Sequence, residues 1–139
     1  GQPSDQGLIY NDHSRILIDR VIFSRPDNVI KHIGVLVSDQ PFGFEQQTIE
    51  TLFPVGSTVH VQVDSERRNL LSECHTAGHV VDAAMAMCNM ILPPEKGYHF
   101  LDGPYVEYTG TVPVEDRNRL LTSLQSAFQV YDFSCIVDT

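Results

Sequence analysis

Two histidines, His75 and His79, lie four residues apart in the segment ECHTAGHVVDAAMAMC, residues 73–88. In a helix, residues i and i+4 lie one above the other on the same face, so both imidazoles could bind one metal ion. The zinc-protease motif also requires a glutamate directly after the first histidine, as general base. Thr76 occupies that position, which excludes the protease interpretation.

The neighbours of the pair add candidates for the same site. Asp82 lies three residues after His79 and could orient that imidazole by accepting a hydrogen bond from it. Ala77 and Gly78 are small and would allow another segment or a ligand to approach the helix closely. Zinc takes three or four protein ligands, and the pair supplies two. From spacing alone, two ordinary helix histidines are the favoured interpretation.

Composition limits the class of protein. The 139 residues are 42% hydrophobic, enough for one compact domain or two small lobes sharing a core. A net charge of −9 argues against a protein that mainly binds phosphates, DNA included. Three cysteines without paired spacing predict a reducing, cytoplasmic location, and no run predicts a membrane span. The chain does not begin with methionine, so we expect a fragment of a longer protein.

Hydrophobic periodicity predicts an α+β fold. Ile- and Val-rich runs predict strands over residues 8–11, 15–24, 29–37 and 57–64, with a loop over 38–57. A long helix follows from residue 65, capped by Asp64 or Ser65, to about residue 91, where Pro93 and Pro94 end it. Residues 97–103 predict a loop or short strand, 104–112 a strand, 115–129 a second helix and 130–137 a further strand.

Three segments together resemble the alanyl-tRNA editing family, which comprises the AlaX proteins and the editing domain of alanyl-tRNA synthetase. They are GQPSDQG (1–7), VDSERRNLLSECHTAGHVVDAAM (63–85) and GYHFLDGPYVEYTG (97–110). Their order and spacing agree with the family from the first residue to about residue 129. The resemblance implies a β-barrel-like lobe over residues 1–64, which carries the end of a glycine-rich motif. It also implies an editing core over residues 65–139, with two helices on a sheet, incomplete at the C-terminus.

The resemblance implies an activity as well: zinc-dependent hydrolysis in trans of the ester bond of Ser-tRNA(Ala) or Gly-tRNA(Ala). His75 and His79 match the first pair of the family's zinc ligands. The second pair, a distant CxxxH, is not matched: Cys135 has Thr139 where the histidine should stand, so Cys135 is only a further candidate ligand. The resemblance also implies residues that contact the substrate and the tRNA. His99 would contact the serine hydroxyl, and Arg67 and Arg68 would contact the acceptor end of the tRNA. The residues near the substrate would be Thr76, Gln2, Ser4 and Asp5.

Less specific interpretations stay open for these residues. His99 could be a histidine of a surface loop, GQPSD a capped turn, and the two arginines solvated residues at a helix start. At the level of the whole chain, the alternative is a non-catalytic tRNA- or synthetase-binding relative that has lost part of the zinc site. The acidic charge and the unmatched second ligand pair favour that alternative. A third interpretation, an unrelated zinc hydrolase, is supported by the HxxxH spacing alone.

Overall fold

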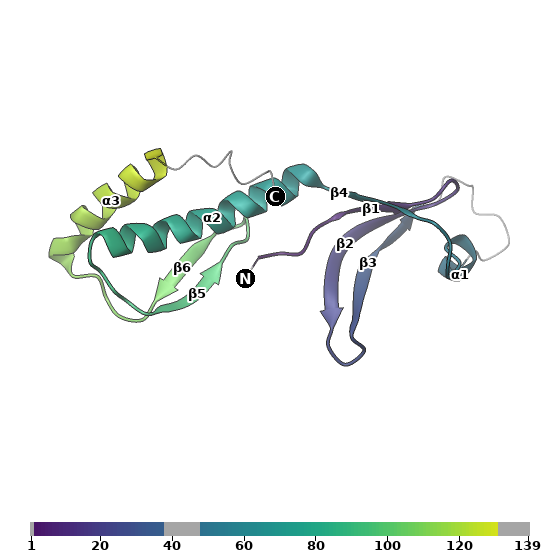
Figure 1. The fold of residues 1–139 in the computed structure, drawn as a ribbon, viewed down its shortest axis with the longest axis horizontal. Coiled ribbons are helices and arrows are strands. Elements are labelled where there is room, and N and C mark those ends of the chain that lie inside the picture. The colour runs from purple at the N-terminus through teal and green to yellow at the C-terminus, as the bar shows by residue number, and fades with distance from the viewer. Residues whose placement is uncertain (1, 38–47, 131–139) are drawn as a thin grey trace. The chain divides into compact units, whose positions relative to one another are not determined.

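The computed structural model describes residues 2–37 and 48–130 of the chain. Contacts divide the chain into two compact units, one of Ser4–Arg68 and one of Gly1–Pro3 together with Asn69–Thr139. The order of helices and strands along the chain is shown in Figure 1. The sequence predicts a division between residues 64 and 65; in the structure the division falls within the first turns of the long helix.

The unit Ser4–Arg68 is built on a four-stranded antiparallel sheet. Its strands are β1 (Gly7–Tyr10), β2 (Arg15–Ser24), β3 (Val29–Val37) and β4 (His60–Val63), in the order β3-β2-β1-β4. The β2–β3 hairpin has the bounds predicted from its β-branched runs, and its turn ends at Asn28, which adopts a φ of 52°, a conformation that asparagine tolerates. In the described residues β3 and β4 are free edges, so the predicted barrel-like lobe is an open sheet.

The connection between β3 and β4 includes a short helix. Residues 38–47 lie outside the described part of the chain, and α1 (Ile49–Leu52) occupies part of the segment predicted as loop. The side-chain amide of Asn11 donates a hydrogen bond of 2.8 Å to the carbonyl of Leu52, which ties this helix to the loop after β1. The predicted strand over residues 57–64 is shorter in the structure, because pairing with β1 covers only four residues.

The long helix α2 (Ser65–Met87) carries the histidine pair. Its start is capped by Asp64, whose Oδ1 accepts a hydrogen bond of 3.0 Å from the backbone N–H of Arg67. Its end is a Schellman motif: Asn89 adopts a φ of 55°, and the N–H groups of Asn89 and Met90 bond to the carbonyls of Ala86 and Met85. The helix therefore ends before residue 91, because asparagine terminates it ahead of the proline pair.

The cap makes a stability prediction. Asp64→Ala is expected to lower the free energy of unfolding by about 0.5–2 kcal/mol, because the N–H of Arg67 loses its acceptor. Urea denaturation followed by circular dichroism measures the change. Ser65→Ala is the matched control, since Ser65 is the first residue inside the helix. An equal loss in both variants would contradict the assignment of Asp64 as the cap.

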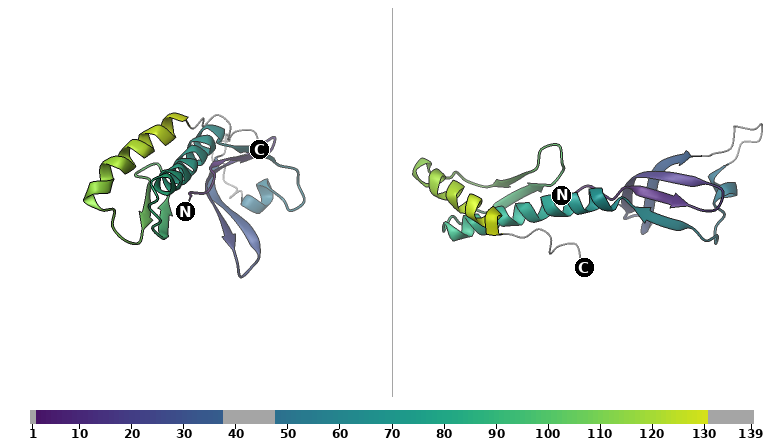
Figure 2. Two further views of the ribbon diagram at one scale, coloured as in Figure 1. Left: turned by 60° about the vertical axis from the view of Figure 1, so that its left-hand side comes forward. Right: turned by 90° about the horizontal axis from the view of Figure 1, so that it is seen from above.

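The second unit packs a hairpin and a helix against α2. Strands β5 (Pro94–Tyr98) and β6 (Tyr105–Tyr108) form the antiparallel hairpin, and a 3₁₀ turn (Val114–Asp116) leads into α3 (Arg117–Val130). Figures 1 and 2 show that the hairpin and α3 flank α2. Pro94 begins a strand instead of a loop, as proline can at the first strand position. Beyond Val130, the predicted strand over 130–137 lies outside the described residues.

The core of this unit is centred on α2. The buried side chains on and just after the helix are Leu71, Val80, Ala84, Met85 and Cys88. Two hydrogen bonds join α3 to α2 and to the residue that follows it. Ser123 Oγ donates to the carbonyl of Ala84 at 3.3 Å, and Cys88 Sγ donates to the carbonyl of Arg119 at 3.7 Å. The elements together make an α+β fold, which confirms the predicted class. In the described part of the chain, no helix is both long and apolar enough to cross a membrane.

Candidate metal centre

The structure places His75 and His79 side by side on α2. Their ring centroids are 5.0 Å apart and their planes are inclined by 30°. The side chain of His79 is 68% exposed, so its imidazole is accessible to a solute. The prediction that the two histidines share one helix face is therefore confirmed.

Each of the two imidazoles has its Nδ1 atom bound to an oxygen acceptor. His75 Nδ1 lies 2.9 Å from Oε1 of Gln2, and His79 Nδ1 lies 3.4 Å from Oδ2 of Asp82. A side-chain amide oxygen and a carboxylate oxygen only accept hydrogen bonds, so Nδ1 of each ring is placed to donate one. In the Nδ1–H tautomer Nε2 carries no proton, which is the state in which an imidazole binds a metal ion.

Asp82 is itself held by a second residue. The hydroxyl of Tyr108, on β6, donates a hydrogen bond to Asp82 Oδ1, the oxygen that His79 does not use. Burial, followed by this hydrogen bond and the charge of Asp82, raises the pKa of Tyr108 well above its ordinary value. The hydroxyl therefore stays protonated and remains a donor at neutral pH. His79, Asp82 and Tyr108 form a chain of two hydrogen bonds that joins α2 to the hairpin.

His99 packs against the pair from the hairpin side. Its ring stacks on that of His75, with centroids 4.6 Å apart and planes 5° from parallel. It is 9% exposed, so the surface-loop interpretation is wrong. Burial, and then the neighbouring His75, lowers the pKa of His99, which favours the neutral imidazole at neutral pH.

Two glycines leave the space that the ring of His99 occupies. A Cβ built on Gly78 would lie 2.5 Å from Cε1 of His99, and one built on Gly97 would lie 2.6 Å from its Nε2. Both distances are too short for real atoms. The expected close approach at Gly78 is therefore confirmed, and the approaching group is His99.

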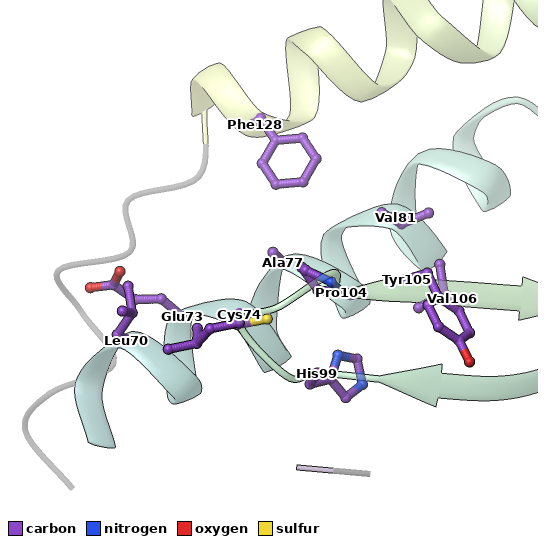
Figure 3. Close-up of a pocket in the computed structure, with 12 residues that line it drawn as sticks. Leu70, Glu73, Cys74, Ala77, Val81, His99, Pro104, Tyr105, Val106 and Phe128 are labelled. Atoms are coloured by element: carbon purple, nitrogen blue, oxygen red, sulfur yellow. The ribbon is translucent and has the colours of Figure 1, made fainter. Parts of the chain in front are cut away.

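A mostly apolar pocket of about 590 Å³ adjoins His99 (Figure 3). One face of α2, the end of the hairpin and Phe128 of α3 line it. The polar side chains in its lining include Glu73, Cys74 and His99, and burial raises the pKa of the Cys74 thiol. His99 thus contributes to the pocket wall and contacts the histidine pair at the same time. A ligand in this pocket would lie against the residue that stacks on His75.

The other predicted site residues fall in different places. Thr76 is partly buried on α2, between the two histidines. Ser4, Asp5, Arg67 and Arg68 meet in the unit Ser4–Arg68. There Ser4 Oγ accepts from the N–H of Val21 at 3.0 Å, while Arg67 donates to the carbonyl of Ser4 at 3.0 Å and Arg68 lies 3.6 Å from Asp5. These contacts hold the N-terminal segment; the substrate and tRNA roles of the four residues stay predictions.

The donors present fit zinc as two of its ligands. Imidazole nitrogen is a preferred zinc donor, and both rings are oriented by acceptors at Nδ1. His99 does not add a third, because a lone pair lies in the plane of its ring and stacked parallel rings cannot direct their lone pairs at one ion. Within residues 2–37 and 48–130, no three His, Cys, Asp or Glu side chains form a group that could hold a metal. Cys135 lies outside these residues.

Comparison with known proteins gives one sequence relative. Alanine–tRNA ligase of Streptococcus mutans serotype c (strain ATCC 700610 / UA159) is 34% identical over 87 residues, which cover 61% of this chain and 8% of the ligase. The chain is similar to part of an alanine–tRNA ligase. No family model matches the chain, and no solved structure matches it. The similarity agrees with the motif-based resemblance as far as the alanyl-tRNA system.

Two contacts were not predicted from the sequence, that of Gln2 with His75 and that of Tyr108 with Asp82. Tyr108 was part of a predicted strand without a role, and Gln2 was assigned to the substrate although it bonds to His75. Both lie far from their partners in the sequence. One feature of the sequence does point to Tyr108. Gly78 allows the hairpin to approach α2 closely, and Tyr108 lies in that hairpin.

Proposed function

We propose that this chain hydrolyses the ester bond between a wrongly attached amino acid and the 3′ end of tRNA(Ala), with a zinc ion bound in part by His75 and His79. The observation that carries the proposal is the histidine pair on one helix face, with Nδ1 of each ring bound to an oxygen acceptor. The similarity to part of an alanine–tRNA ligase supports alanyl-tRNA as the substrate system and translation as the process.

Such an activity is needed because a binding pocket for alanine rejects similar amino acids only weakly. A pocket that accepts alanine rejects glycine or serine by only about 1–3 kcal/mol per group, so a second, hydrolytic site must remove the errors. That site has to recognise the serine hydroxyl. His99 is suited to this because it is buried, neutral and next to the histidine pair, and a neutral imidazole can donate or accept one hydrogen bond with a hydroxyl.

The reaction is an ordinary ester hydrolysis. The oxygen of a water molecule bonds to the carbonyl carbon, the bond from that carbon to the ribose oxygen breaks, and the ribose oxygen takes a proton. Bound zinc would lower the pKa of water and polarise the carbonyl. His75 and His79 would hold the ion through Nε2, while Gln2 and Asp82 keep the two rings oriented. Arg67 and Arg68 remain the proposed contacts to the tRNA acceptor end, and a cytoplasmic location remains the expectation.

A second candidate function is a tRNA- or synthetase-binding module without catalysis. It is favoured by the absence, among the described residues, of a third metal-ligating side chain beside the pair. It predicts binding of tRNA without hydrolysis, whether or not zinc is supplied.

The test is a deacylation time course with Ser-tRNA(Ala), Gly-tRNA(Ala) and Ala-tRNA(Ala). We expect the zinc-supplied chain to hydrolyse a mischarged tRNA at least about 100-fold faster than it hydrolyses Ala-tRNA(Ala) or than the ester decays alone. A chelator should remove the activity, and added zinc should restore it. Hydrolysis at the spontaneous rate with zinc present, together with a tRNA mobility shift, would overturn the proposal in favour of the binding module.

A further inference from the structure

We propose that Tyr108 is a positioning residue that fixes the tautomer of His79 through Asp82, and that Gln2 does the same for His75. The two arms together leave Nε2 as the nitrogen without a proton in both histidines. The inference that this arrangement presents two metal-binding nitrogens rests on the proposed function. The assignment of the tautomers does not depend on it.

The Tyr108 arm begins at the hairpin. The Tyr108 hydroxyl donates to one oxygen of the Asp82 carboxylate, and the other oxygen lies 3.4 Å from Nδ1 of His79. A carboxylate that is bonded at one oxygen has less freedom to rotate, so its second oxygen is held facing the imidazole. Asp82 is three residues after His79 on α2, and a helix alone would leave its side chain free to point elsewhere. β6 supplies the constraint.

The Gln2 arm acts on the other imidazole. Oε1 of Gln2 lies 2.9 Å from Nδ1 of His75, and His99 stacks on the face of the same ring. The hydrogen bond fixes which nitrogen carries the proton, and the stacking fixes the ring plane. Gln2 belongs to the same unit as His75 although it is 73 residues away in the sequence. This contact gives the glutamine of the N-terminal GQPSD segment a function that does not involve the substrate.

The consequence is a specific tautomer for each ring. An unconstrained neutral imidazole of histidine prefers to carry its proton on Nε2, and an acceptor at Nδ1 reverses this preference. Both histidines should therefore be Nδ1–H tautomers in the chain without metal. Partners of this kind typically contribute about 10–100-fold to metal affinity.

The hairpin offers a matched control. Tyr98, on β5, also uses its hydroxyl on an aspartate, donating to Asp102 at 3.1 Å. Tyr98→Phe and Tyr108→Phe each remove one hydroxyl from the same hairpin, and each hydroxyl donates to an aspartate. The hydroxyl of Tyr98 does not contact Asp82. An effect of general hairpin stability would appear in both variants, and an effect on His79 only in Tyr108→Phe.

The first experiment is nitrogen NMR of the imidazole groups in the metal-free 139-residue chain, at a pH where imidazole is neutral. We expect His79 and His75 of the parent chain to be Nδ1–H tautomers. Tyr108→Phe and Asp82→Ala should shift His79 toward Nε2–H and leave His75 unchanged; Gln2→Ala should do the reverse. Tyr98→Phe should change neither ring. Parent histidines in the Nε2–H form, or a Tyr108→Phe spectrum like the parent's, would overturn the inference.

The second experiment is a zinc titration of the same variants. A decrease in zinc affinity of about 10-fold in Tyr108→Phe, absent in Tyr98→Phe, supports the inference together with the metal site. If the tautomers respond as expected but the parent chain binds no zinc, the zinc-dependent function fails and the positioning assignment stands. If zinc binds equally to the parent and to Tyr108→Phe with unchanged tautomers, the positioning assignment fails and the metal site stands.

Discussion

Replacing His79 with alanine is expected to lower the zinc affinity of the chain by at least about 100-fold, more than loss of an orienting partner would. The expected cause is direct loss of one of the two nitrogen donors, since His75 and His79 lie with ring centroids 5.0 Å apart on one helix face. Hydrolysis of mischarged tRNA(Ala) should fall to the spontaneous rate. Zinc titration and the deacylation time course measure the two effects separately.

The control for this variant is His13→Ala. His13 is an exposed loop histidine of the unit Ser4–Arg68, so its removal should change neither zinc affinity nor hydrolysis. His79 has a largely exposed side chain, so the free energy of unfolding without metal should change little in His79→Ala. Unaltered zinc affinity in a folded His79→Ala chain would show that the pair is not the metal site.

Gly78→Ala is expected to destabilise the chain by about 1–2 kcal/mol, although alanine is the better helix former by about 1 kcal/mol. The new Cβ would lie 2.5 Å from Cε1 of His99. The ring cannot easily move away, because the backbone at Gly97 and the ring of His75 confine it on other sides. Urea denaturation gives the free energy of unfolding, and the NMR signals of His75 report whether the stacking is lost.

A double-mutant cycle separates this clash from other effects of the substitution. In a His99→Ala background the confining ring is absent, so Gly78→Ala should be neutral or stabilising by up to about 1 kcal/mol. The change of sign between the two backgrounds is the expected result. The same loss of stability in both backgrounds would mean that Gly78 is required for a reason unrelated to His99.

Local features of the chain were the ones that sequence reasoning predicted well. The strands β2 and β3 follow from continuous Ile- and Val-rich runs, and the start of α2 follows from Asp64 ahead of a helical pattern. The shared face of His75 and His79 follows from helix geometry alone. In each case the interactions that decide the structure lie within a few residues, so the sequence displays them directly.

The features that were missed depend on distant contacts or on competing local signals. Tyr108 meets Asp82, and Gln2 meets His75, only after the hairpin and the N-terminal segment have folded onto α2. The predicted end of α2 was too late, because it was assigned from Pro93 and Pro94, whereas Asn89 ends the helix before them. The N-terminal lobe was expected to resemble a barrel, but short β1 and β4 pair over four residues and leave an open sheet in the described part of the chain.

The zinc content of the purified 139-residue chain, measured by elemental analysis beside that of His75→Ala, tests the central claim most directly. His75 is one of the two donors on α2, and its Nδ1 is already occupied by Gln2. The proposed function predicts about one zinc ion per parent chain and its loss in His75→Ala. Equal zinc content in the two proteins, whether one ion or none, would contradict a metal centre built on this histidine pair.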